Sequence, residues 1–150
     1  MEFARTIVQD LNKLLQIDLT PEQNGLQVEG TKEIKKIVFG VSANMALFEE
    51  GVKKDAQMLI VHHGLLWGHE QKITGVFGAR VRFLIKNNLN LVAYHLPLDK
   101  HPVLGNNAGL AKLPTMHTKH TMNGTSRVPR LKTLEASMPN LAAASAVFVA

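Results

Sequence analysis

The segment QMLIVHHGLLW, residues 57–67, contains an apolar run that ends in two adjacent histidines and a glycine. A short continuous apolar run is typical of a strand that is buried on both faces of a sheet. We therefore predict a strand over residues 57–61. His62 and His63 follow where this strand gives way to a loop, and Gly64 would ease the turn. Three roles are open to the two imidazoles: filling a core, donating hydrogen bonds, or holding metal.

Strands and helices alternate on both sides of this segment. Residues 34–43 (IKKIVFGVSA) and 89–94 are rich in the residues that buried strands favour. Four helices are predicted around them, over residues 2–16, from an Asn44 cap to about Lys54, over 79–87, and from near Asn106. This alternation indicates an α/β fold with a parallel or mixed sheet flanked by helices.

Two of these helices are predicted from stripes of apolar residues at three- and four-residue spacing. The stripe of the first helix is Phe3, Ile7, Leu11, Leu14 and Leu15. The stripe of the helix over residues 79–87 is Val81, Leu84 and Ile85.

The composition is that of a globular domain. The 150 residues are 45% hydrophobic and 19% charged, and no apolar run approaches the roughly 18 residues of a transmembrane helix. The start of the chain mixes acidic and basic residues, which is unlike a secretory signal. There are no cysteines, so disulfides and thiolate metal sites are excluded. With no targeting segment, we expect a cytoplasmic protein without membrane contact.

The net charge of +5 is concentrated near the end of the chain. Residues 1–110 hold 12 Lys/Arg and 11 Asp/Glu, whereas the last 40 residues hold five basic residues against Glu135 alone. After about Leu113 the sequence also loses any sustained periodicity. We expect residues 114–150 to form a divergent, basic, poorly ordered tail outside the sheet. A solvated basic tail is more common than a specific nucleic-acid reader, so we do not expect nucleic-acid binding.

Two polar clusters follow neighbouring predicted strands. His62 and His63 end one strand, and His95 with Asp99 follows the strand at residues 89–94. Because ligands bind beyond the carboxyl ends of parallel strands, both clusters should face one crevice. Imidazole and carboxylate are the cysteine-free ligands of Zn, Mn, Fe or Co. Adjacent side chains that diverge suit two ions about 4 Å apart, a common hydrolytic arrangement.

The remaining histidines carry weaker signals. We expect His69 and His101 to lie on exposed loops, and His117 and His120 to be surface residues of the tail. We expect Trp67 to pack beside the crevice or line it rather than to stack on a base. The sequence has no phosphate-binding loop, dinucleotide fingerprint or nucleophile elbow.

Four segments resemble a known family: QNGLQVEG (23–30), IVFGVSA (37–43), LIVHHGLLW (59–67) and AYHLPLDKHPVLGNNAGLA (93–111). They are similar to the Nif-three-like dinuclear metal-binding proteins, also called GTP cyclohydrolase type 2 homologues. The resemblance implies one lobe of a two-lobed α/β fold, here residues 1–113. It also implies a hexameric ring of subunits and a two-metal centre in a crevice.

Carried over by position, the resemblance places His62 and His63 on separate ions and Asp99 on one of them. It places His95 beside the metals, in contact with a ligand or with the substrate. The family completes its site with a C-terminal H-x-x-x-E pair, which this chain lacks. A truncated or frameshifted version of a longer protein would explain both this absence and the divergent tail.

Two functions follow as hypotheses. The first is a metal-dependent hydrolase acting on small, nucleotide-like substrates, weakened by the missing ligands. The second is a catalytically inactive fragment that acts as a protein-interaction module. A lobe built to pack against another lobe and other subunits would expose an apolar face when alone, so we also expect poor solubility.

Overall fold

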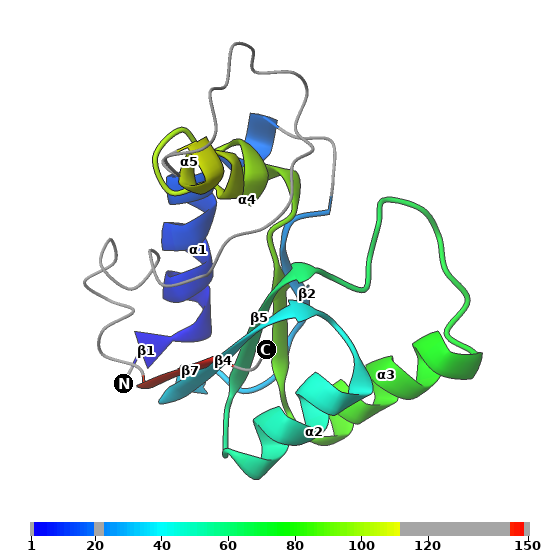
Figure 1. Ribbon diagram of the computed structural model, residues 1–150. Coiled ribbons are helices and arrows are strands. Elements are labelled where there is room, and N and C mark those ends of the chain that lie inside the picture. Colours follow the sequence, from blue (N-terminus) through cyan, green and yellow to red (C-terminus); the bar gives the residue numbers. More distant parts are fainter. Residues whose placement is uncertain (1, 20–22, 112–144, 149–150) are drawn as a thin grey trace.

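A mixed five-stranded sheet organises the molecule (Figure 1). The computed structural model describes residues 2–19, 23–111 and 145–148. The strand order is β2-β6-β5-β4-β7, and β2 alone runs antiparallel to its neighbour. The strands are β2 (Gly25–Val28), β4 (Lys36–Ser42), β5 (Met58–His63), β6 (Asn90–Ala93) and β7 (Ser145–Phe148). The predicted α/β class with a mixed sheet flanked by helices is confirmed.

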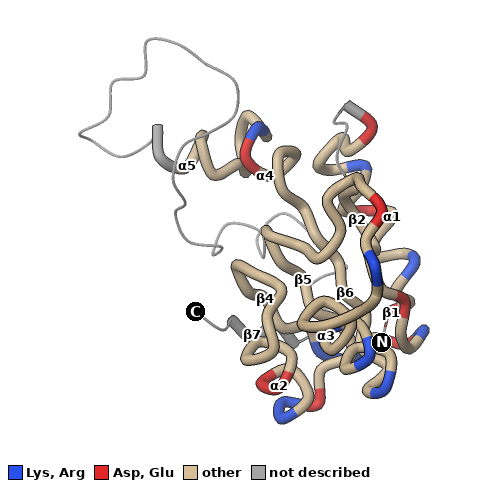
Figure 2. The backbone as a smooth tube through the Cα atoms, turned by 90° about the vertical axis from the view of Figure 1, so that its right-hand side faces the viewer, with Lys and Arg blue, Asp and Glu red and all other residues tan. Residues whose placement is uncertain are grey.

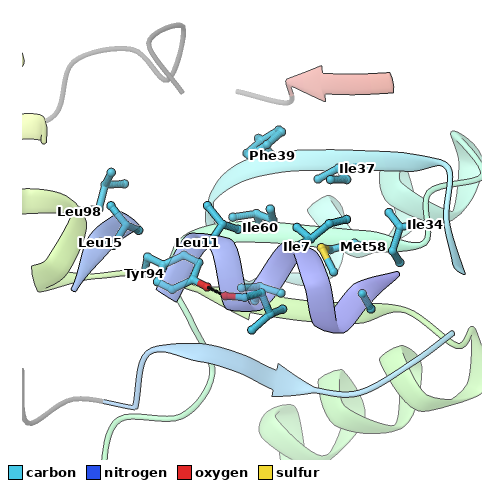
Figure 3. Packing of buried hydrophobic residues seen from close by; sticks show 13 residues of the cluster. Ile7, Leu11, Leu15, Ile34, Ile37, Phe39, Met58, Ile60, Tyr94 and Leu98 are labelled. Atoms are coloured by element: carbon cyan, nitrogen blue, oxygen red, sulfur yellow. Dashed lines mark hydrogen bonds between the residues drawn. The ribbon is translucent and has the colours of Figure 1, made fainter. Parts of the chain in front are cut away.

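Helices cover both faces of this sheet, because the central strands are apolar on both sides. Alternate residues of the strands pack into two buried clusters. One cluster lies under α1 (Ala4–Leu15) and includes Ile37, Met58 and Ile60 (Figure 3). The other lies under α2 (Met45–Lys53) and α3 (Gly75–Lys86).

Tyr94 ties α1 to the end of β6. Tyr94 is 2% exposed and belongs to the buried cluster under α1 (Figure 3). Its hydroxyl donates to Oδ1 of Asn12 at 2.7 Å and lies 3.4 Å from the carbonyl oxygen of Val8. Burial raises the pKa of this phenol well above its ordinary value. The hydrogen bonds fix the segment that leads into the second polar cluster.

The start of the first helix differs from the prediction. Phe3 belongs to strand β1 (Glu2–Phe3), which pairs with β3 (Glu33–Ile34), and its side chain is 60% exposed. The amide of Ala4 donates to the carbonyl of Lys32 at 2.8 Å, which holds the preceding backbone extended. The assignment of Phe3 to the apolar stripe was therefore wrong.

The other helices agree in place and differ in detail. The predicted Asn44 cap is confirmed, because its Oδ1 accepts from the amide of Leu47 at 2.9 Å. Helix α3 begins at Gly75, four residues before the predicted start. Its buried face is formed by Gly78 and Leu84, and Ile85 is 58% exposed, so its place in the stripe was wrong. Short helices follow at α4 (Leu96–Lys100) and α5 (Asn106–Ala111), and a single 3-10 turn covers Ile17–Leu19.

Part of the predicted tail belongs to the sheet. Residues 145–148 pair in parallel with β4 through the register Lys36↔Ser145 to Phe39↔Phe148. We had expected residues 114–150 to lie outside the sheet, and for this segment that expectation was wrong. The short apolar run there can pair with the open edge of β4, although it is too short to be recognised by periodicity. Residues 112–144 lie outside the described part of the chain.

Basic and acidic residues are interspersed along the described chain (Figure 2). Among the described helices, none combines the length and apolar character needed to cross a bilayer.

Candidate metal centre

Strand β5 carries His62 and His63 to the carboxyl edge of the sheet. It extends through both residues to His63, which is paired with Ser42 of β4. The prediction that His62 and His63 end this strand is confirmed, and the strand runs two residues beyond the predicted limit at residue 61. The ladder continues because the amide of Ala43 donates to the carbonyl of His63 at 2.8 Å.

Adjacent strand residues point to opposite faces, yet these two rings lie close together. Nδ1 of His62 donates to the carbonyl oxygen of Tyr94 at 3.0 Å, which draws this ring toward the end of β6. Nδ1 of His63 lies 3.0 Å from Oγ of Ser42, at the end of β4. The ring centroids are 4.6 Å apart. The two neighbours therefore line one site from opposite sides of β5.

His95 joins this pair from the next strand. It follows β6, and its backbone amide donates to Oδ1 of Asn24 at 2.9 Å. Its ring centroid lies 4.8 Å from that of His62 and 5.5 Å from that of His63. One candidate ligand atom from each of the three histidines falls within 4.8 Å of the others. The structure thus brings together the two clusters that the strand order placed at one edge.

Asp99 approaches the same site from α4. Its Oδ2 lies 3.6 Å from Nε2 of His62, and both side chains are 10% exposed. Its Oδ1 accepts a hydrogen bond from Nδ2 of Asn106 at 2.7 Å, across the contact between α4 and α5. The buried carboxylate is therefore held in one orientation, with its second oxygen turned to His62.

The donor set fits a divalent metal. The Tyr94 carbonyl can only accept, so a neutral His62 carries its proton on Nδ1, and the lone pair of Nε2 then faces the carboxylate of Asp99. Two facing lone pairs repel unless a cation or a proton lies between them. Two ligands of a tetrahedral ion with bonds of about 2.1 Å are about 3.4 Å apart, close to the 3.6 Å found here. Hydrogen bonds that fix ligand tautomers and carboxylates are typical of metal sites.

The electrostatics favour the neutral imidazole that metals require. Partial desolvation lowers the pKa of His63, and the neighbouring His62 and His95 lower it further, whereas Asp99 acts in the opposite direction. His63 is therefore less readily protonated than an isolated imidazole. Because a proton and a metal ion compete for the same ring nitrogen, the lowered pKa favours metal binding.

Gln27 of β2 supports this site and was missed by sequence reasoning. Its Oε1 accepts from the amides of Leu65 (2.7 Å) and Leu66 (3.2 Å), and its Nε2 donates to the carbonyl of Leu66 (3.0 Å). A Cβ on Gly64 would lie 2.3 Å from Oε1 of Gln27. Gly64 is thus needed for this close approach, and its predicted role of easing a turn gives way to this steric one.

Trp67 follows this hydrogen-bonded loop and lines the site, as one of the two predicted alternatives. Its ring centroid is 5.1 Å from that of His95, with the planes at 84°, and 6.3 Å from that of His63. It is 42% exposed.

The other described histidines lie elsewhere. His69 is on an exposed loop beside Gln71, as expected. Nδ1 of His101 accepts from the amide of Leu104 at 3.0 Å and so serves the turn after α4. His117 and His120 fall outside the described residues.

Comparison with known proteins places these features in a family. A sequence model described as Duf34/NIF3 (NGG1p interacting factor 3) matches residues 3–147. This match extends beyond Leu113, where the motif resemblance ended. A Vibrio cholerae protein named GTP cyclohydrolase 1 type 2 homolog is 53% identical over 109 residues, covering 68% of this chain and 43% of the relative. A Pasteurella multocida protein of the same name is 42% identical over 149 residues, covering 98% of this chain and 59% of the relative.

Solved structures give the same result. The crystal structure of TTHA1606 from Thermus thermophilus matches with a TM-score of 0.69 and 39% identity, over 73% of this chain and 47% of that protein. The protein ybgI, described as of unknown function, matches with a TM-score of 0.69 and 44% identity over 73% and 45%. The chain spans about half the length of the curated relatives it matches.

Proposed function

This chain belongs to the Duf34/NIF3 family, and from that premise we propose that it is the metal-binding lobe of a metal-dependent hydrolase. The observation that carries the proposal is the convergence of His62, His63 and His95 at the carboxyl edge of the sheet, with ligand atoms within 4.8 Å of one another. A carboxylate, Asp99, completes the set from α4.

Each residue has a proposed task. His62 and Asp99 would hold one ion, and His63 would contribute to a second. His95, beside both rings, contacts the substrate. Zn, Fe, Mn or Co suits these nitrogen and oxygen ligands. When bound, such a metal lowers the pKa of water toward neutrality and polarises the group under attack.

The surrounding residues prepare the site for this chemistry. The Tyr94 carbonyl holds the proton of neutral His62 on Nδ1, which leaves Nε2 as the ligand atom. Asn106 holds the Asp99 carboxylate, and the depressed pKa of His63 favours its neutral form. We propose a nucleotide as substrate, with GTP as first probe, because the curated relatives are named GTP cyclohydrolase 1 type 2 homologues.

The test is metal-dependent turnover of GTP, followed by chromatography. Wild-type chain reconstituted with Zn²⁺, Mn²⁺, Fe²⁺ or Co²⁺ should consume GTP slowly, and chelation should abolish the reaction. His62→Ala should be inactive, whereas His69→Ala, which alters an exposed loop, should match wild type. Turnover that survives chelation or the His62→Ala change would refute the hydrolase.

A second candidate is an inactive fragment that serves as a protein-interaction module, possessing the metal site without turnover. It is favoured by exposed apolar side chains beside and on α3: Ile73 (59%), Val76 (69%) and Ile85 (58%). These residues would pack against a further lobe or another copy of the chain, and the family resemblance suggests homo-oligomers. Stoichiometric metal binding with no turnover of GTP would favour this candidate.

A further inference from the structure

Trp67 is a large apolar side chain kept at a polar site. It is 42% exposed, and its ring lies beside the imidazoles of His95 and His63. An indole gains most when its surface leaves water, so a tryptophan that serves only for packing is normally more deeply buried.

The backbone that carries Trp67 is held rigidly. Gln27 accepts from the two amides that precede Trp67 along the chain and donates to the carbonyl of Leu66. The absence of a side chain at Gly64 lets the Gln27 amide reach this backbone. These three hydrogen bonds hold the backbone before Trp67 in one position and so fix where the indole lies. Gly68 then turns the chain away with a φ of +83°, a conformation that favours glycine.

The indole also has a defined orientation. It meets the ring of His95 edge to face, at 84° and 5.1 Å between centroids, and lies 6.3 Å from the ring of His63. Because Trp67 is 42% exposed despite these two ring contacts, part of the indole surface stays available beside the histidine cluster. A flat, rigid aromatic wall at this position suits a planar heterocycle, which every nucleobase provides.

We propose that Trp67 is a substrate-contacting residue that stacks on a purine ring while the metal-binding residues engage the rest of the nucleotide, and that Gln27 is its positioning residue. This inference rests on the proposed function, since it names the part of the substrate that the site recognises beside the metal.

The experiment uses the fluorescence of Trp67, the only tryptophan in the chain. The Zn²⁺-loaded full chain is titrated with GTP and, separately, with inorganic tripolyphosphate, which has the charged chain and no base. GTP should change the emission in a saturable way, and tripolyphosphate should leave it nearly unchanged. Equal changes with both, or no change with GTP, would overturn the proposal.

Calorimetry on variants supplies the second measurement. Trp67→Leu should weaken GTP binding on the order of tenfold, whereas Trp67→Phe, which keeps an aromatic face, should stay within about threefold of wild type. Gln27→Ala should weaken GTP binding as Trp67→Leu does, and Gln27→Glu should recover part of it because its carboxylate still accepts from both loop amides. Zn²⁺ content should be unchanged in all four variants. Wild-type GTP affinity in Trp67→Leu would contradict the stacking role.

The two proposals fail separately. A wild-type chain that takes up no metal refutes the proposed function, and the same titrations on the metal-free chain then decide the role of Trp67. A chain that binds Zn²⁺ and turns over GTP equally well with Trp67→Leu refutes this inference alone.

Discussion

Gly64→Ala gives the sharpest test of how the loop after the two histidines is built. The φ of Gly64 lies outside the positive range that favours glycine, so the backbone itself accepts alanine. In an open environment such a change stabilises a protein by about 0.4–1 kcal/mol, because it restricts the unfolded chain. Here the new methyl would lie 2.3 Å from Oε1 of Gln27 and 2.6 Å from Cβ of Ala93.

Neither neighbour can move away without loss. Ala93 is 3% exposed in the central strand β6, and the Gln27 amide forms its hydrogen bonds to the loop. Overpacking costs about 1–3 kcal/mol, and each lost hydrogen bond adds about 0.5–1.5 kcal/mol. We therefore expect Gly64→Ala to lower the free energy of unfolding by about 2–5 kcal/mol.

Urea unfolding followed by circular dichroism measures this difference. Gln27→Ala provides the matched partner, because it removes one of the two clashing groups. The double variant should lose clearly less free energy of unfolding than the sum of the losses in the two single variants, since the hydrogen bonds can be lost only once. A Gly64→Ala chain as stable as wild type, or strictly additive effects, would refute the close packing of Gly64 against Gln27.

Further predictions concern Tyr94, Asn44 and His63. Tyr94→Phe leaves Oδ1 of Asn12 without its 2.7 Å donor and should cost about 1–3 kcal/mol in urea unfolding. Tyr94 is the only tyrosine, and burial raises its pKa, so no phenolate absorbance should appear as the folded chain passes pH 10.0. The stability that the neutral phenol contributes is present below that pH and is lost above it. Phenolate absorbance that appears at the pH of an ordinary tyrosine would contradict the burial of Tyr94. Asn44→Ala removes the cap of α2 and should cost about 1 kcal/mol, whereas Asn44→Asp should restore most of the thermal midpoint. The lowered pKa of His63 means that the unfolded chain binds this proton more readily, so the metal-free chain should lose thermal stability as pH falls through 6.5, and a midpoint that rises on acidification would argue against it.

The central strands could be predicted because their signal is local. Residues 34–43, 57–61 and 89–94 are apolar runs, and a strand buried on both faces needs little else. The placement of His62, His63 and His95 at one edge could be predicted because they lie at the carboxyl ends of two strands that were expected to run parallel. Phe3 and Ile85 were assigned wrongly for a different reason: they continue an apolar spacing, but pairing with β3 and the rotation of α3 decide their exposure.

The supporting residues of the site could not be predicted from local patterns. Gln27 contacts Leu65 across 38 positions, and this contact depends on the antiparallel register of β2 with β6. The same register brings Gln27 so close to Gly64 that a side chain at residue 64 would clash with it. Strand β7 pairs with β4 more than 100 positions away, and four residues carry too little periodicity to show it.

Metal binding by the purified chain tests the central claim most directly. Metal-free protein is titrated with Zn²⁺ in a calorimeter, and bound metal is then measured by mass spectrometry after dialysis. We predict about one Zn²⁺ or more per chain for wild type and for the exposed control His69→Ala, with affinity lowered on the order of a hundredfold in His62→Ala and in Asp99→Asn. Less than one bound metal per wild-type chain, or wild-type affinity in His62→Ala, would contradict a metal centre at this edge of the sheet.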